Sequence, residues 1–127
     1  MSTPSLDQTE AYSASRATAP RVSVKNIEDQ MESVIYINLG DAIERTNQSA
    51  SASSFLMTLC VITMRNGFVE VGKSAPASPE NFDREKGKTF AYEDAVRNLW
   101  PKLGYALRDT LWQWENYKEM PAVAFSE

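Results

Sequence analysis

An uninterrupted run of apolar residues, Leu59 to Ile62, lies in the middle of the chain, in one of two strand-like segments on either side of Asn66 and Gly67. Residues 57–65 and 68–74 are rich in β-branched and aliphatic side chains, which favour strands. An Asn-Gly pair between two such segments is a typical hairpin turn, because both residues accept a positive φ. The pattern therefore predicts an antiparallel β-hairpin at the centre of the fold.

The expected turn also sets the expected register of the hairpin. A two-residue turn places Met64 opposite Val69. Apolar side chains then occur on both faces of the sheet, so each face needs a cover. One cover is expected to be the chain's own helices, and the other a second subunit. The pairs further from the turn are Ile62 with Val71 and Cys60 with Lys73.

A leading helix is predicted after Ser23, because serine is a favourable residue at helix N-termini. Residues 36–39 form a short apolar segment that fits an edge strand, and Gly40 marks a turn after it. The apolar residues that recur with the spacing of one helical face are Val24, Ile27, Met31, Val34 and Ile35.

Two consecutive helices are predicted in the C-terminal part of the chain. Ser78 followed by Pro79 is a strong helix start, and this helix is expected to end near Leu99. Pro101 ends the first helix and begins the second. The apolar stripe of the second helix consists of Leu103, Leu107, Thr110, Leu111 and Trp114.

Aromatic residues are dense near the C-terminus. Trp100 and Trp114 are expected in the core, whereas helical geometry places Trp112 about 200° from Trp114. One buried face cannot hold both. Trp112 and Tyr117, together with Tyr105, are therefore candidates for a contact between copies in a homo-oligomer, unless a terminal segment folds back over them.

These elements predict a single α+β domain over residues 22–118. It contains an antiparallel, hairpin-centred sheet packed with the leading helix and the two C-terminal helices. Residues 1–21 hold few large apolar groups and are expected to form a disordered arm. Residues 45–54 are rich in serine and predict a flexible loop, and residues 119–127 are expected to be a frayed tail.

Composition narrows the possible functions. The chain has 127 residues, a net charge of −4, no histidine and a single cysteine, Cys60. Without histidine the common catalytic triads and zinc sites cannot be built, and one cysteine cannot form an intrachain disulfide. The mild acidity disfavours a nucleic-acid reader, and neither a membrane span nor a signal peptide is apparent. We expect a cytoplasmic, non-catalytic protein without cofactor or metal.

The loop from Ser74 to Asn81 is the best candidate for a ligand site. Free N–H groups at the start of a helix, together with the polar side chains of Ser74, Ser78 and Asn81, can hold an anion such as a phosphate. Lys73 and Arg84 would add positive charge beside it. The loop therefore predicts an anion site.

The alternative for this loop is an ordinary helix cap. Glu80 and Asp83 lie where an anion would bind, and their carboxylates already occupy the positive end of the helix. The carboxylates that follow alternate with lysines and arginines, which is typical of a solvated face rather than of a magnesium or catalytic site.

Several motifs follow one another in a fixed order within residues 22–111. They are Thr58-Leu59-Cys60-Val61-Ile62, Asn66-Gly67-Phe68, Gly72-Lys73-Ser74-Ala75, Ala77-Ser78-Pro79-Glu80-Asn81-Phe82-Asp83, Gly87, Ala95-Val96, Trp100-Pro101 and Gly104-Tyr105. This run resembles the small tailed-phage protein family known by its gene-49 and gene-66 members. The chain departs from the family at Pro76, where the family has a cysteine.

The resemblance implies a phage or prophage protein that is not part of the virion and acts in the cytoplasm of the infected bacterium. It implies no activity and no site residues. The hypothesis is an accessory protein that binds a host protein, in host takeover or anti-defence. The alternative is an oligomeric protein that sequesters a small phosphorylated nucleotide signal, and a magnesium-dependent hydrolase ranks third.

Overall fold

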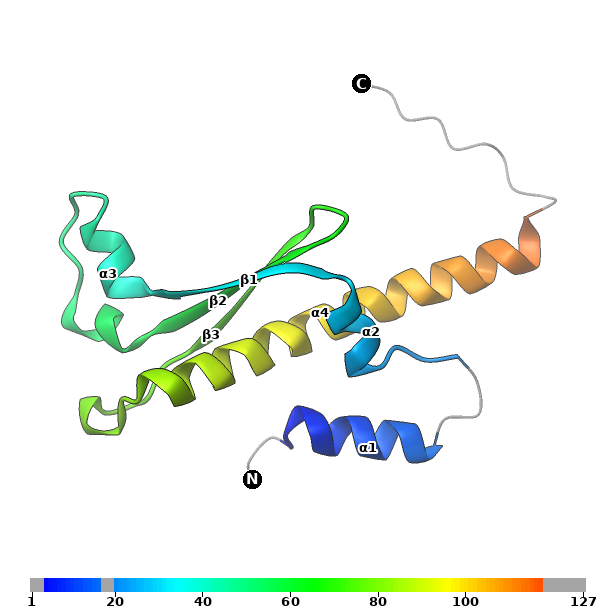
Figure 1. Cartoon of the computed structure of the whole chain (residues 1–127), viewed down its shortest axis with the longest axis horizontal. Coiled ribbons are helices and arrows are strands. Elements are labelled where there is room, and N and C mark those ends of the chain that lie inside the picture. Colours follow the sequence, from blue (N-terminus) through cyan, green and yellow to red (C-terminus); the bar gives the residue numbers. More distant parts are fainter. Residues whose placement is uncertain (1–3, 17–19, 118–127) are drawn as a thin grey trace, which may run out of the picture.

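A three-stranded antiparallel sheet packed against one long helix organises the fold (Figure 1). The computed structural model describes residues 4–16 and 20–117. The central strand of the sheet is β2, and the expected α+β class is confirmed. The elements are α1 (Leu6–Arg16), α2 (Val24–Asp29), β1 (Met31–Asn38), α3 (Leu39–Glu44), β2 (Thr58–Met64), β3 (Val69–Ser74) and α4 (Arg84–Asn116), with 3₁₀ turns at Ala52–Leu56 and Pro79–Asn81.

The leading helix is shorter than predicted. Ser23 caps it as expected, since its hydroxyl accepts the Asn26 N–H at 3.0 Å while the Asn26 amide oxygen accepts the Ser23 N–H. The helix ends at Asp29, however, and the chain continues as strand β1. Val34 and Ile35 therefore belong to a strand rather than to a helical face, because pairing with β2 uses the β-branched residues of this segment.

The hairpin between β2 and β3 has a different register from the predicted one. The Met64 carbonyl accepts the Gly67 N–H at 2.9 Å, and the Met64 N–H donates to the Phe68 carbonyl at 2.8 Å. Only Gly67 of the Asn-Gly pair has a positive φ, at +90°, so the turn holds three residues and ends in a bulge. Val69 thus faces Thr63 rather than Met64.

This one-residue change moves Val69 and Val71 to the opposite face of the sheet. The inner face, which packs on α4, carries the buried β2 residues and Gly72. The outer face is defined here by the aliphatic residues Ile35, Ile37, Leu59, Val61, Val69 and Val71.

The core lies between the inner face and the first half of α4. Gly72 is needed there, because a Cβ at this position would overlap the Ala91 carbonyl oxygen and the Ala95 backbone. Small residues on both elements thus let strand and helix approach closely. The core residues without any exposed surface are Ile27, Cys60, Ile62, Ala91, Ala95, Val96 and Leu99.

One helix, α4, replaces the two predicted helices. Pro79 starts only a 3₁₀ turn, and Asp83 is the N-cap of α4. Pro101 lies inside the helix although a proline there costs about 3 kcal/mol. The residues on each side of the proline contact other elements: the Trp100 indole N–H donates to the Val22 carbonyl at 2.9 Å, and Lys102 pairs with the Glu70 carboxylate.

The flanking segments differ from expectation as well. The predicted disordered arm contains helix α1, whose Leu6 lies in the core and whose Glu10 pairs with Arg21 at 2.5 Å. The serine-rich segment 45–54 includes the start of the first 3₁₀ turn, at Ala52. The predicted tail, residues 119–127, lies outside the described residues.

Candidate functional site

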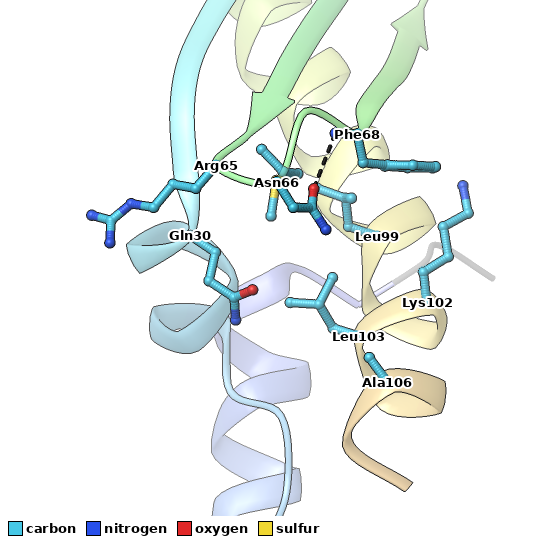
Figure 2. A pocket seen from close by; sticks show the side chains of 9 residues that line it. Gln30, Arg65, Asn66, Phe68, Leu99, Lys102, Leu103 and Ala106 are labelled. Atoms are coloured by element: carbon cyan, nitrogen blue, oxygen red, sulfur yellow. Dashed lines mark hydrogen bonds between the residues drawn. The ribbon is translucent and has the colours of Figure 1, made fainter. Parts of the chain in front are cut away.

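An apolar groove of about 490 Å³ lies between the hairpin turn and the middle of α4 (Figure 2). The turn contributes Phe68, the end of the α2 segment contributes Gln30, and α4 contributes one side of the groove. Apolar side chains predominate along the groove, which is typical of a surface that binds an apolar ligand or peptide. The lining residues are Gln30, Met64, Arg65, Asn66, Phe68, Leu99, Lys102, Leu103 and Ala106.

A hydrogen bond within the turn fixes the position of Phe68 at the groove. The Asn66 amide oxygen accepts the Phe68 N–H at 3.0 Å, as the dashed line in Figure 2 shows. Gly67 supplies the left-handed conformation that closes the turn. Phe68 stays 45% exposed, so a bound partner can cover a large part of its ring.

Lys102 is the cation at the groove. Its ammonium pairs with the Glu70 carboxylate and lies 5.2 Å from the centre of the Phe68 ring. The Lys102 side chain is 49% exposed whereas Glu70 is only 12% exposed, so the ammonium keeps its bond to Glu70 and can donate a further hydrogen bond to a carboxylate of a partner. The Arg65 side chain points away from Lys102 in Figure 2.

The predicted anion loop is only partly assembled. Ser74 and Asn81 line one hollow of about 210 Å³, together with Asp83 and Lys86. Asp83 itself accepts the first free N–H groups of α4, from Glu85 at 3.0 Å and Lys86 at 3.1 Å. The positive end of the helix is therefore already occupied by a carboxylate, which corresponds to the helix-cap alternative.

The other residues proposed for that site lie apart from it. The Ser78 hydroxyl donates to Glu80, and this hydrogen bond lowers the pKa of the Glu80 carboxyl. Lys73 lines a different hollow beside α1, and Arg84 lines a third hollow beside Tyr36. The structure thus separates the two cations from Ser74 and Asn81.

The aromatic residues predicted at an interface are exposed. Tyr105 is 76%, Trp112 45% and Tyr117 68% exposed within the described residues. Trp114, which we expected in the core, is 71% exposed, because α4 extends past the end of the sheet (Figure 1). A contact between copies through Trp112 and Tyr117 stays a prediction.

No other side chain in the described residues suggests a catalytic or metal-binding role. Cys60 is fully buried, and this burial raises the pKa of its thiol to about 11, so it stays protonated at neutral pH. Within residues 4–16 and 20–117, no group of three or more Cys, Asp or Glu side chains could hold a metal ion. No helix in the described part of the chain is long and apolar enough to cross a membrane.

Sequence reasoning missed the groove itself. Phe68 and Lys102 come from segments 34 residues apart, and neither was named as a candidate site residue from the sequence. The available signal was Phe68 directly after Gly67, since a large aromatic residue beside an exposed turn has no local partner to cover it.

Residues 22–111 match the family described as "Phage protein (N4 Gp49/phage Sf6 gene 66) family". The chain belongs to this phage protein family. Every residue that lines the groove lies within the matched region, whereas α1 and the residues from Trp112 onward lie outside it. No curated protein and no solved structure matches the chain.

Proposed function

We propose that this phage protein acts in the cytoplasm of the infected bacterium as a non-catalytic accessory protein that binds a host protein through the groove. The observation that carries this proposal is that the apolar groove continues along α4 into a second, partly polar hollow. Leu103 and Ala106 line the groove and also this second hollow of about 390 Å³, which continues to Leu107 and Thr110 and has Arg21 and Asn26 along it. An apolar centre with a more polar border is typical of protein contacts.

The chemistry of the groove indicates what kind of segment it accepts. Phe68, Leu103 and Ala106 offer accessible apolar surface, and Lys102 offers a positive charge beside them. A helix or short peptide with a large apolar side chain and a nearby carboxylate matches this arrangement. The carboxylate of the host segment then shares the Lys102 ammonium with Glu70.

Capture from a lysate of the phage's bacterial host tests the proposal. The tagged protein is compared with Ala106→Glu, which places a carboxylate in the groove at an exposed position. Thr89→Glu makes the same charge change at an exposed position of α4 outside the groove and is the matched control. We expect one stoichiometric host protein with wild type and Thr89→Glu, and at least tenfold less with Ala106→Glu.

Two results would contradict the proposal. One is the absence of any stoichiometric partner for the folded wild-type protein, and the other is equal capture by Ala106→Glu and Thr89→Glu. Lys102→Gln sharpens the test, because it keeps most of the side chain and removes the charge. It is expected to weaken binding of the captured protein by about three- to tenfold, mostly through loss of the ion pair.

A second candidate function is sequestration of a small phosphorylated nucleotide. It is supported by the hollow that Ser74 and Asn81 share with Lys86. Asp83 in the same hollow repels an anion, so we rank this function second. Calorimetry with nucleotides tests it, and Lys86→Gln should abolish the binding heat if a phosphate binds there, whereas Ala106→Glu, which lies outside this hollow, should not.

A further inference from the structure

We propose that two copies of this chain pair through the exposed edge of β1, joining their sheets into one continuous antiparallel sheet. The inference rests on a difference between the two edges of the sheet. An unpaired edge strand presents a row of N–H and C=O groups that can pair with another strand, unless the fold blocks it. Here the fold blocks one edge and leaves the other open.

The β3 edge is closed by side chains of α4. The Lys73 N–H donates to the Asp94 carboxylate at 2.9 Å, and the Val71 carbonyl accepts the Asn98 amide N–H at 3.2 Å. These bonds use main-chain groups that an added strand would need. A second copy therefore cannot pair along β3 without breaking them.

The β1 edge presents its main-chain groups outward. The Leu39 N–H donates to the Met57 carbonyl at 3.0 Å, on the side of β2. The main-chain groups of successive residues point to opposite sides of a strand. The N–H and C=O groups of Ile35 and Ile37 therefore also point to β2, and those of Val34 and Tyr36 point to the free edge. Within the described residues, no side chain bonds to the main chain of Val34 or Tyr36.

The side chains of this edge are apolar and uncharged where pairing would occur. Ile35 is 54% exposed, and Val34 and Tyr36 are each more than a third exposed. The strand contains neither proline nor lysine, the residues that usually protect an edge, and its single charge is Glu32 near its start. An exposed apolar edge of this kind is a pairing surface.

A two-fold axis at Ile35 gives a register in which no charged residues oppose each other. Because the strand is complementary to itself in this register, a second copy is favoured over a foreign strand. Ile35 then faces Ile35 of the second copy in a non-hydrogen-bonded pair. Val34 faces Tyr36 of the second copy, and their outward main-chain groups form the hydrogen bonds. The regular part of the strand, residues 33–38, carries no charge, since Glu32 lies at the irregularity between Met31 and Ser33, so no like charges oppose each other in the paired segment.

The inner face also leaves room for this pairing. The helix α4 packs mainly on β3 and β2, and Figure 1 shows β1 on the side of the sheet away from α4. In the pair, both α4 helices lie on the same side of the joined sheet, each over its own β2 and β3.

Disulfide trapping tests the pairing directly. Opposed Cα atoms in a non-hydrogen-bonded pair are about 4.5 Å apart, which a disulfide can bridge. Ile35→Cys is compared with Val71→Cys, which lies on the same outer face but on the closed edge and is 43% exposed. The native Cys60 is fully buried and does not interfere. We expect a disulfide-linked dimer from Ile35→Cys and none from Val71→Cys.

Sedimentation equilibrium provides an independent measurement. Ile35→Lys opposes two lysines at the axis and should raise the dimer dissociation constant at least tenfold, whereas Val71→Lys should leave it within about twofold. The inference is overturned if the wild-type protein is a monomer at 100 µM. It is also overturned if Val71→Cys links as readily as Ile35→Cys, which indicates stacking of outer faces, or if Ile35→Lys leaves the dimer intact.

Discussion

The two halves of α4 have similar patterns of apolar residues but different surroundings. In the first half Ala91, Ala95 and Leu99 are fully buried against the sheet, whereas Tyr105 and Trp114 in the second half are mostly exposed. Figure 1 shows the reason, since the helix continues beyond the end of the sheet. An apolar stripe on a helix therefore indicates a need for a cover, and only the tertiary structure shows whether the chain itself provides it.

The groove, which is the proposed functional surface, lies at the boundary between the two halves of α4. The groove lies where the covered half of α4 becomes the free half, so it is bounded by a rigid core on one side and by uncovered apolar residues on the other. A partner that binds there extends the packing that the sheet provides for the first half. The predictions below test this contrast, from the largest effect to the smallest.

The largest contrast is expected between Leu99→Ala and Trp114→Ala. Leu99 is fully buried, so its truncation should lower the free energy of unfolding by about 2–5 kcal/mol. Trp114 is largely exposed, so its loss should change that free energy by less than about 0.5 kcal/mol. Urea unfolding of both variants measures the difference, and equal losses would show that the second half is also packed.

Two glycine replacements should change stability in opposite directions. Gly72→Ala forces strand β3 away from α4 and should cost about 1–3 kcal/mol. A Cβ at Gly104 meets no atom within 4 Å, so Gly104→Ala in the free half should stabilise the helix by about 0.5–1 kcal/mol. Thermal unfolding of the two variants checks the signs, and a destabilised Gly104→Ala would reveal a contact on the second half.

Stability should fall at alkaline pH because of a thiol under the first half of α4. Burial raises the pKa of Cys60 from 9.0 to about 11, so the unfolded chain loses this proton at lower pH than the folded chain. The stabilisation is complete below pH 9 and is lost between pH 9 and 11, by up to about 1.4 kcal/mol per pH unit. Urea unfolding across this range should show a smaller slope for Cys60→Ala.

The sequence was sufficient for the central hairpin, the α+β class and the family resemblance, because strand periodicity and turn residues are local signals. It was insufficient for the hairpin register, which depends on whether both Asn66 and Gly67 take a positive φ or only Gly67 does. It also assigned residues 31–35 to a helix, because their apolar spacing fits both periods and pairing with β2 decides between them.

The candidate site was harder to predict than the fold. The anion loop was expected from local chemistry, but whether Lys73 and Arg84 join Ser74 depends on how β3 and α4 are placed, and the structure directs the cations elsewhere. The groove arises because Pro101 does not end the helix. Trp100 and Lys102, on either side of Pro101, bond to Val22 and Glu70, and no local pattern reveals such contacts between distant segments.

Hydrogen exchange along α4, with and without the captured host protein, tests the central claim most directly. In the free protein we expect the amides of residues 91–99 to exchange at least ~10³-fold more slowly than those of residues 107–114, because all the fully buried side chains of α4 lie in its first half. Binding of the host protein should then slow the second half and leave the first half unchanged. Slow exchange of residues 107–114 in the free protein, or no change in them on binding, would contradict the account.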